Sequence, residues 1–303
     1  MDNKIHNLLK QYGINPIGYT KNKSCIILDT KDGKYVLKKH NKDLEETFTY
    51  LYTRSYDFFP RYKNIGDYDL YEYIDNNPLP KYDSSLEMIN LISLLHNKTT
   101  VYERIDIDDY KKIYEEVKAK VVSLISYYNE INDLIDNEIF MSPSNYLLVR
   151  NISKVYATLD FCNKGIDNWY ELVKENKKDR KTITHNNLKL DNLLLSSKAY
   201  LISWDKVRLD FPINDLYNFY NNNSDVEFSY LYNLYEKKYP LHEDERLLLF
   251  VLISIPDRID FTNDELLNCK KIKDMLNKIV RTEEVISKYY SNDENEKEHN
   301  FTK

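Results

Sequence analysis

The segment from residue 183 to residue 205 constrains the fold of this 303-residue chain more than any other feature. It contains two short apolar runs, Asn192–Leu195 and Ala199–Ile202, which are separated by the polar turn Ser-Ser-Lys. Runs of this length bounded by turn residues predict two antiparallel strands. They interrupt a stretch that otherwise has helical periodicity. We therefore expect a β-hairpin inserted into a mainly helical region.

The first 75 residues predict a small sheet with one helix after a short amphipathic helix at the N-terminus. An Asp32-Gly33 step separates two β-type runs, and such a step is typical of a hairpin. A helical period then precedes two further β-type runs. The expected elements are a helix over 1–12, strands over 25–28 and 34–37, a helix over 43–56, and strands over 61–65 and 69–74.

The rest of the chain predicts a larger, mainly helical domain. Residues 76–80 contain two prolines and predict a linker. We therefore expect an α+β protein with a lobe over 1–77, a helical lobe over 78–290 that carries the 183–205 hairpin, and a disordered polar tail over 291–303. Expected helices cover 86–96, 107–135, 146–177 (as one helix or two) and much of the chain after residue 215.

Composition excludes several classes of protein. The net charge of −6 lacks the basic footprint of a nucleic-acid binder. Cys25, Cys162 and Cys269 are far apart, which argues against a disulfide framework or a zinc site. The longest apolar run, 247–255, is too short to span a bilayer, and the N-terminus lacks an apolar signal core. We expect a cytoplasmic protein whose partner is a small molecule or another protein, with no nucleic acid and no membrane.

An ordered series of motifs carries a resemblance to a known family. His185 is followed seven residues later by Asn192, then by the hairpin, by Leu201-Ile202-Ser203-Trp204-Asp205, and by the helix-opening pair Asp215-Leu216. This order resembles the catalytic core of the aminoglycoside phosphotransferase and choline kinase family. There the pattern is His-Gly-Asp, four residues, Asn, a hairpin, Ile-Asp-Trp-Glu and Asp-Leu. The resemblance implies a two-lobed protein kinase-like fold, with ATP and Mg²⁺ as cofactors.

The resemblance assigns roles to the loop residues, but two key carboxylates are replaced. Asn187 occupies the position of the catalytic Asp, and Ser203 that of the metal-binding Asp. An Asn orients a hydroxyl but accepts no proton, and loss of a general base costs ~10²–10⁴ in rate. Ser offers a neutral oxygen where a hard dication prefers an anionic one. His185 would orient the loop, and Asn192 would bind metal.

Neighbouring carboxylates are possible substitutes for the lost ones. Asp191 precedes Asn192, and Asp205 lies two residues after Ser203. Residues two apart on a strand share a face, so Asp205 is a candidate metal ligand beside Ser203. Asp191 is the corresponding candidate in the catalytic loop.

The N-terminal lobe supplies the expected nucleotide contacts. The run Tyr35-Val-Leu-Lys38 resembles the strand that carries the phosphate-pairing Lys, so Lys38 is the candidate, with Glu46 or Glu45 as its partner. The run 70–75 resembles the strand that joins the lobes, so the backbone from Glu72 to Ile74 would face the adenine. The expected phosphate loop, 18–24, contains a single Gly.

Three interpretations follow. The first is a pseudokinase that acts as a binding or assembly module, as in kinase-related spore-coat proteins that resemble this family. The second is an active ATP-dependent phosphotransferase that uses rearranged metal ligands to phosphorylate a hydroxyl of a small molecule. The third is an unrelated helical protein with chance matches.

Overall fold

The structure is a computed structural model that describes residues 3–22, 25–104, 107–176 and 178–301. The chain divides into two compact units, each of which is discontinuous in sequence. Unit 1 comprises Met1–Thr100 and Thr182–Asp210, and unit 2 comprises Val101–Lys181 and Phe211–Lys303. The predicted boundary after residue 77 therefore falls inside unit 1. The segment around the predicted hairpin belongs to unit 1 and not to the helical unit 2.

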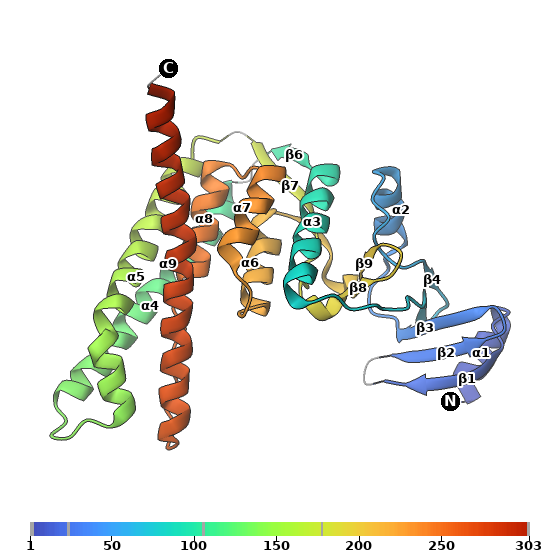
Figure 1. The fold of residues 1–303 in the computed structure, drawn as a ribbon, viewed down its shortest axis with the longest axis horizontal. Helices are drawn as coiled ribbons and strands as arrows, with labels where there is room; N and C mark the ends of the chain where they lie inside the picture. The colour runs from blue at the N-terminus through green and yellow to red at the C-terminus, as the bar shows by residue number, and fades with distance from the viewer. Residues whose placement is uncertain (1–2, 23–24, 105–106, 177, 302–303) are drawn as a thin grey trace. The chain divides into compact units, whose positions relative to one another are not determined.

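Unit 1 is built on a five-stranded antiparallel sheet with the order β1-β2-β3-β5-β4 (Figure 1). Four strands and the helix α2 match the predicted β-β-α-β-β pattern. The edge strand β1 is additional, because its sequence contains Pro16 and Gly18, buries little and gives no clear apolar alternation. The elements in the first 100 residues of unit 1 are α1 (Asn3–Gln11), β1 (Pro16–Lys21), β2 (Ile26–Thr30), β3 (Gly33–Lys39), α2 (Glu45–Thr53), β4 (Tyr62–Asn64), β5 (Tyr68–Glu72) and α3 (Lys81–Thr99).

Helix α1 packs against one face of this sheet. Leu9 is fully buried in a cluster with Leu28, Leu37 and Leu70, so successive strands contribute one apolar side chain each. The helix ends at Gly13, which has φ +76. The N–H of the next residue donates to the Leu9 carbonyl at 2.9 Å, and the Gly13 N–H donates to the Lys10 carbonyl at 3.0 Å. This is a Schellman ending, which turns the chain directly into β1.

The predicted hairpin is present in unit 1 and completes it. Strands β8 (Leu193–Leu195) and β9 (Ala199–Leu201) pair in register, with Leu194 opposite Tyr200. A 3₁₀ turn, η2 (Trp204–Lys206), and strand β10 (Arg208–Asp210) follow. A second 3₁₀ turn, η1 (Leu190–Asn192), immediately precedes β8.

An aromatic cluster attaches the hairpin segment to α2. The ring of Trp204 lies edge-on to Phe48 and Phe59, with centroids 5.8 Å and 6.0 Å away. Phe48 and Phe59 stack on one another at 4.2 Å. All three side chains are buried, which fixes the residues beside Trp204 relative to the sheet.

Unit 2 is mainly helical, and α5 is its central helix. It packs against α4, α8 and α9 (Figure 1). The Ser142 hydroxyl caps α5 by accepting from the Asn145 N–H at 3.2 Å, and Pro143 occupies the first turn. The helices are α4 (Ile107–Asp136), α5 (Pro143–Val173), α6 (Ile213–Asn222), α7 (Phe228–Lys238), α8 (Glu243–Ser254) and α9 (Glu265–Phe301).

Two further strands were not predicted, because their sequences are dominated by charged residues. Strand β7 (Lys178–Thr184) runs from unit 2 into unit 1. Residues 178–181 pair with β6 (Val101–Arg104), and residues 182–184 pair with β10. Helix α9 extends through residue 301, into the 291–303 segment that is predicted to be a disordered tail. In the part of the chain that the structure describes, no helix is long and apolar enough to cross a bilayer.

Candidate functional site in unit 1

Side-chain and backbone hydrogen bonds organise the loop that precedes β8. The backbone carbonyl of Asn187 accepts from the Lys189 N–H at 3.0 Å and from Asn192 Nδ2 at 2.8 Å. The backbone carbonyl of Asn192 in turn accepts from the Ile202 N–H at 2.9 Å. The two halves of the motif region are therefore joined through Asn192.

Two residues of this region have left-handed backbone conformations. Asn186 has φ 56, and Ser203 has φ 66 with ψ 52. Asn tolerates this conformation better than most residues, whereas Ser rarely adopts it. Asn186 occupies the glycine position of the His-Gly-Asp pattern, and this correspondence is visible in the sequence alone. The side-chain amide of Asn187, the residue after Asn186, donates to the backbone carbonyl of Ser203 at 3.3 Å. This hydrogen bond links the two segments that contain the left-handed residues.

His185 is buried between the loop and the second motif. Its Nε2 lies 3.1 Å from the Ile202 carbonyl oxygen, and because that oxygen only accepts, Nε2 carries the proton. Its ring is 4.6 Å from that of Trp204, in an edge-on arrangement. His185 does not line the cavity of about 410 Å³ that lies beside this loop. Its orienting role stays a prediction, and these contacts are the ones through which it would act.

A cavity of about 410 Å³ lies beside the loop, within the size range of small-molecule pockets. One part is apolar and is formed by Ile27, Val36 and Leu194. The lining also brings together predicted site residues from the N-terminal strands and from the loop region. These are Lys38, Glu72, Ile74, Asp191, Asn192 and Ser203.

Comparison with known proteins identifies the fold. No family model and no curated protein matches the sequence. Among solved structures, an aminoglycoside phosphotransferase from Alicyclobacillus acidocaldarius matches 92% of this chain and 93% of its own length, at TM-score 0.64 and 11% identity. The chain has the fold of an aminoglycoside phosphotransferase. The AMP-bound complex of spectinomycin phosphotransferase also matches, at TM-score 0.52 and 14% identity over 92% of this chain and 96% of that one.

The kinase-like fold confirms the predicted two-lobed α+β class and rules out chance motif matches in an unrelated helical protein. In the sequence, His185, Asn192 and the second motif match positions of the family pattern. In the structure, hydrogen bonds join these residues into one connected frame, which is consistent with that match. Asp215, from the last motif, is buried in α6 of unit 2.

The predicted partner of Lys38 is not in contact with it. Glu45 and Glu46 lie exposed in the first turn of α2, and among the described residues no ion pair joins either to Lys38. Lys38 instead lies over the ring of Tyr71, with Nζ 5.8 Å from the centroid. Its cross-strand partner is Asp69, which is buried. Asp69 begins a predicted strand, but its alignment with Lys38 depends on the register of β3 with β5.

Asp69 is held by several donors. His40 Nδ1 lies 2.8 Å from its Oδ1, and Asn64 Nδ2 and the Tyr62 hydroxyl donate at 3.0 Å and 3.1 Å. Burial, followed by the Asp69 charge, raises the pKa of Tyr62 to about 12. The same two causes, in the same order, raise the pKa of Tyr71 well above its usual range. Both tyrosines therefore stay neutral beside the carboxylate.

The two candidate substitute carboxylates lie in different places. Asp191 lines the cavity beside Asn192. Asp205 is exposed in η2 and is not among the lining residues. Strand β9 ends at Leu201, and the left-handed Ser203 turns the chain into η2. The two-residue alternation that would place Asp205 beside Ser203 therefore does not apply.

The two residues at the metal positions of the family pattern supply no carboxylate of their own for Mg²⁺. Asn192 and Ser203 supply neutral oxygens, and Asp191 is the carboxylate beside them in the cavity. Mg²⁺ in nucleotide sites is usually held by one or two carboxylates together with phosphate oxygens. Within the described ranges, no group of three or more His, Cys, Asp and Glu side chains could hold a metal ion. We derive no step that passes through a metal.

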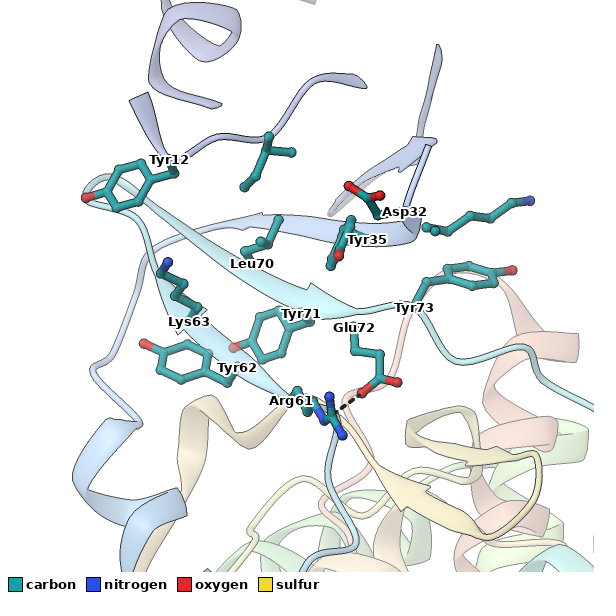
Figure 2. Close-up of a pocket in the computed structure, with 13 residues that line it drawn as sticks. Tyr12, Asp32, Tyr35, Arg61, Tyr62, Lys63, Leu70, Tyr71, Glu72 and Tyr73 are labelled. Atoms are coloured by element: carbon teal, nitrogen blue, oxygen red, sulfur yellow. Dashed lines mark ion pairs between the residues drawn. The ribbon is translucent and has the colours of Figure 1, made fainter. Parts of the chain in front are cut away.

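A second cavity in unit 1, of about 610 Å³, shares the lining residues Tyr71, Glu72 and Tyr73 with the first (Figure 2). Tyr35 and Leu70 line it, on the face that α1 partly covers. Its charged groups have local partners. Arg61 pairs with Glu72 at 3.8 Å, and Lys63 lies 5.6 Å from the Tyr12 ring centroid. This cavity contains none of the loop residues.

Proposed function

We propose that this protein is a pseudokinase: a kinase-like module that binds a nucleotide in the 410 Å³ cavity of unit 1 and transfers phosphate inefficiently or not at all. One observation supports this most directly. The hydrogen-bonded frame of Asn187, Asn192 and Ser203 is complete, while the first and last of these are neutral at positions where the family pattern has carboxylates.

The cavity lining suits a purine nucleotide. Ile27, Val36 and Leu194 offer apolar surface for a flat base. Ile74 lies just beyond the end of β5, and its N–H finds no hydrogen-bond acceptor among the described residues, so it is available to a base nitrogen. Lys38 supplies a cation for the phosphate groups. The spectinomycin phosphotransferase of the same fold binds AMP, which is consistent with this assignment.

The chemistry of the loop disfavours transfer. The Asn187 side chain has no basic site for the proton of an attacking hydroxyl, and its amide donates to the Ser203 carbonyl. Ser203 adds no negative charge to hold a dication against phosphate. Binding without turnover is therefore the expected result, and the module would act through the conformation or partner that the nucleotide stabilises.

One observation favours a second candidate, an active phosphotransferase that acts on a hydroxyl of a small molecule. Asp191 lies in the cavity next to Asn192 and supplies a carboxylate close to the position where the family pattern has one. In this candidate Asp191 replaces a lost acid, and turnover requires a divalent cation.

Calorimetric titration of the full chain with ATP, ADP, AMP and adenosine, each with Mg²⁺ and with EDTA, separates the candidates. The pseudokinase proposal predicts binding whose Kd changes less than about threefold on adding Mg²⁺, with no release of ADP when aminoglycosides or choline are added to ATP. Val36→Trp fills the apolar part of the cavity and should abolish binding. Metal-dependent binding with turnover that Asp191→Asn removes would establish the second candidate, and no binding of any nucleotide would refute both.

A further inference from the structure

The connection between α4 and α5 in unit 2 exposes large apolar side chains. Ile139 and Phe140 are each 90% exposed, and Met141, next in sequence, is 43% exposed. Leu134, in the last turn of α4, is 66% exposed. Isolated exposed apolar residues are common, but a run of three at the end of a helical hairpin is not explained by folding of the chain itself.

The start of α9 extends this surface. The Glu265 side chain accepts a hydrogen bond from the Ser144 N–H at the start of α5. Leu266 follows Glu265 directly and is 82% exposed. In Figure 1 the first turn of α9 and the α4–α5 connection lie at the same, lower end of the helices. We define the apolar tip as the surface formed by Leu134, Ile139, Phe140, Met141 and Leu266.

Exposed acids lie beside Leu134 and Ile139 in the sequence. Glu130, Asp133, Asp136 and Glu138 are all exposed, and the sequence between Lys120 and Arg150 contains no Lys, Arg or His. Local amide groups order two of these carboxylates. Asn145 Nδ2 donates to Glu138 at 2.9 Å and 3.0 Å, and Asn132 Nδ2 donates to Asp136 at 3.1 Å. Because these amide donors are uncharged, the hydrogen bonds do not neutralise the negative charge of the carboxylates.

We propose that the apolar tip is a docking surface for a segment of a partner protein that combines basic and apolar side chains. Burial of Phe140 and Ile139 would supply the apolar contact, and the surrounding carboxylates would select Lys or Arg at its rim. The acids disfavour an anionic bilayer, which attracts basic segments. They also disfavour a second copy of this chain, because facing tips would place like charges together. The proposal goes beyond nucleotide binding and does not depend on it.

The test uses the full chain and two synthetic helical peptides. One peptide is amphipathic, with leucine on one face and lysine on the other, and the control peptide has glutamate in place of lysine. The lysine peptide should bind, and Ile139→Ser with Phe140→Ser should weaken its Kd by about tenfold or more. Asp133→Asn with Asp136→Asn should weaken binding less and reduce its dependence on salt. The glutamate peptide should not bind detectably.

Controls keep the outcomes distinct. All four substitutions replace exposed side chains, so unchanged thermal unfolding and unchanged nucleotide binding by either double variant would show that unit 1 is intact. Equal binding of the lysine peptide by the wild type and the Ile139→Ser, Phe140→Ser variant would overturn the proposal. So would tip-dependent binding to phosphatidylserine vesicles, which indicates a membrane surface, or a wild-type dimer that this variant converts to a monomer, which indicates self-association.

Discussion

Asn192 Nδ2 donates to the backbone carbonyl of Asn187 at 2.8 Å, so the bond uses the side chain of one residue and only the backbone of the other. The formation of this bond therefore does not depend on which side chain occupies position 187. An Asp there would leave this bond unchanged. Under the proposed assignment of this loop, the bond explains how the frame forms with Asn at the position of the family's catalytic Asp.

Restoring both carboxylates should create a metal-dependent nucleotide site. Asp tolerates the left-handed conformation of Ser203, and Asn187→Asp retains the loop bond from Asn192. The double variant Asn187→Asp, Ser203→Asp should therefore bind ATP at least about tenfold more tightly with Mg²⁺ than with EDTA, because two anionic oxygens then hold the cation. Calorimetry measures this ratio.

The matched control is Asn187→Asp with Ser203→Asn, which has the same conformational tolerance at 203 but one charge fewer. Its response to Mg²⁺ should be smaller than that of the variant with both carboxylates. A folded Asp-Asp variant that binds ATP equally with and without Mg²⁺ would count against a kinase-like metal site here.

Asn186 tests the left-handed loop position. Its amide donates to Thr184 Oγ1 at 2.7 Å, and both Asn186→Gly and Asn186→Ala remove that bond. Because Gly accepts φ 56 without a Cβ clash, the Gly variant should be more stable than the Ala variant by roughly 0.5–1 kcal/mol. Urea unfolding measures the difference. At Lys154, exposed within α5, the order should reverse and Ala should be the more stable.

Asp179 should make stability depend on pH. It is 6% exposed and accepts a hydrogen bond from the Tyr110 hydroxyl. Burial raises its pKa from 3.8 to about 6 despite the nearby Lys181, and the acids Asp244, Asp109 and Glu103 add to the effect. Between these pH values the folded state holds a proton that the unfolded state has lost, so this group destabilises the fold as pH rises from about 4 to 6.

Asp179→Asn keeps an acceptor for Tyr110 and removes the titration. The midpoint of thermal unfolding of the variant, minus that of the wild type, should increase from pH 4 to about 6 and stay constant above pH 7. Glu116→Gln, on the exposed face of α4, controls for the change in net charge. A difference that does not change with pH would mean that Asp179 titrates alike in both states.

Gly165 should resist the substitution that usually stabilises a helix. An added Cβ at this position in α5 would lie 2.6 Å from Val251 Cγ2 on α8. Gly165→Ala should therefore cost about 1–2 kcal/mol, whereas a helix-interior Gly→Ala change usually gains about 1 kcal/mol. Adding Val251→Ala removes the clashing methyl, so the effects of the two changes should be less than additive in a double-mutant cycle. Additive losses would exclude the clash as the cause.

Local sequence predicted the elements whose patterns are strongest. The Asp32-Gly33 turn, the Leu193–Leu201 hairpin and the long α4 helix have clear apolar periods or turn residues, and all occur in the structure. Strands β1, β6, β7 and β10 were missed. Strand β1 contains Pro16 and Gly18, and the other three are rich in charged residues, so none has a local apolar pattern. They are strands because neighbouring strands satisfy their backbone groups.

The sequence by itself determined the order of the motifs, which predicted the kinase-like fold, and it has Asn187 and Ser203 where the family pattern has carboxylates. Tertiary structure decided which remaining acids lie where. Asp69 faces Lys38 because β3 and β5 pair in that register, and Asp205 leaves the cavity because Ser203 ends the strand alternation. Sheet register and a single left-handed residue depend on contacts distant in sequence, so spacing along the chain could not reveal them.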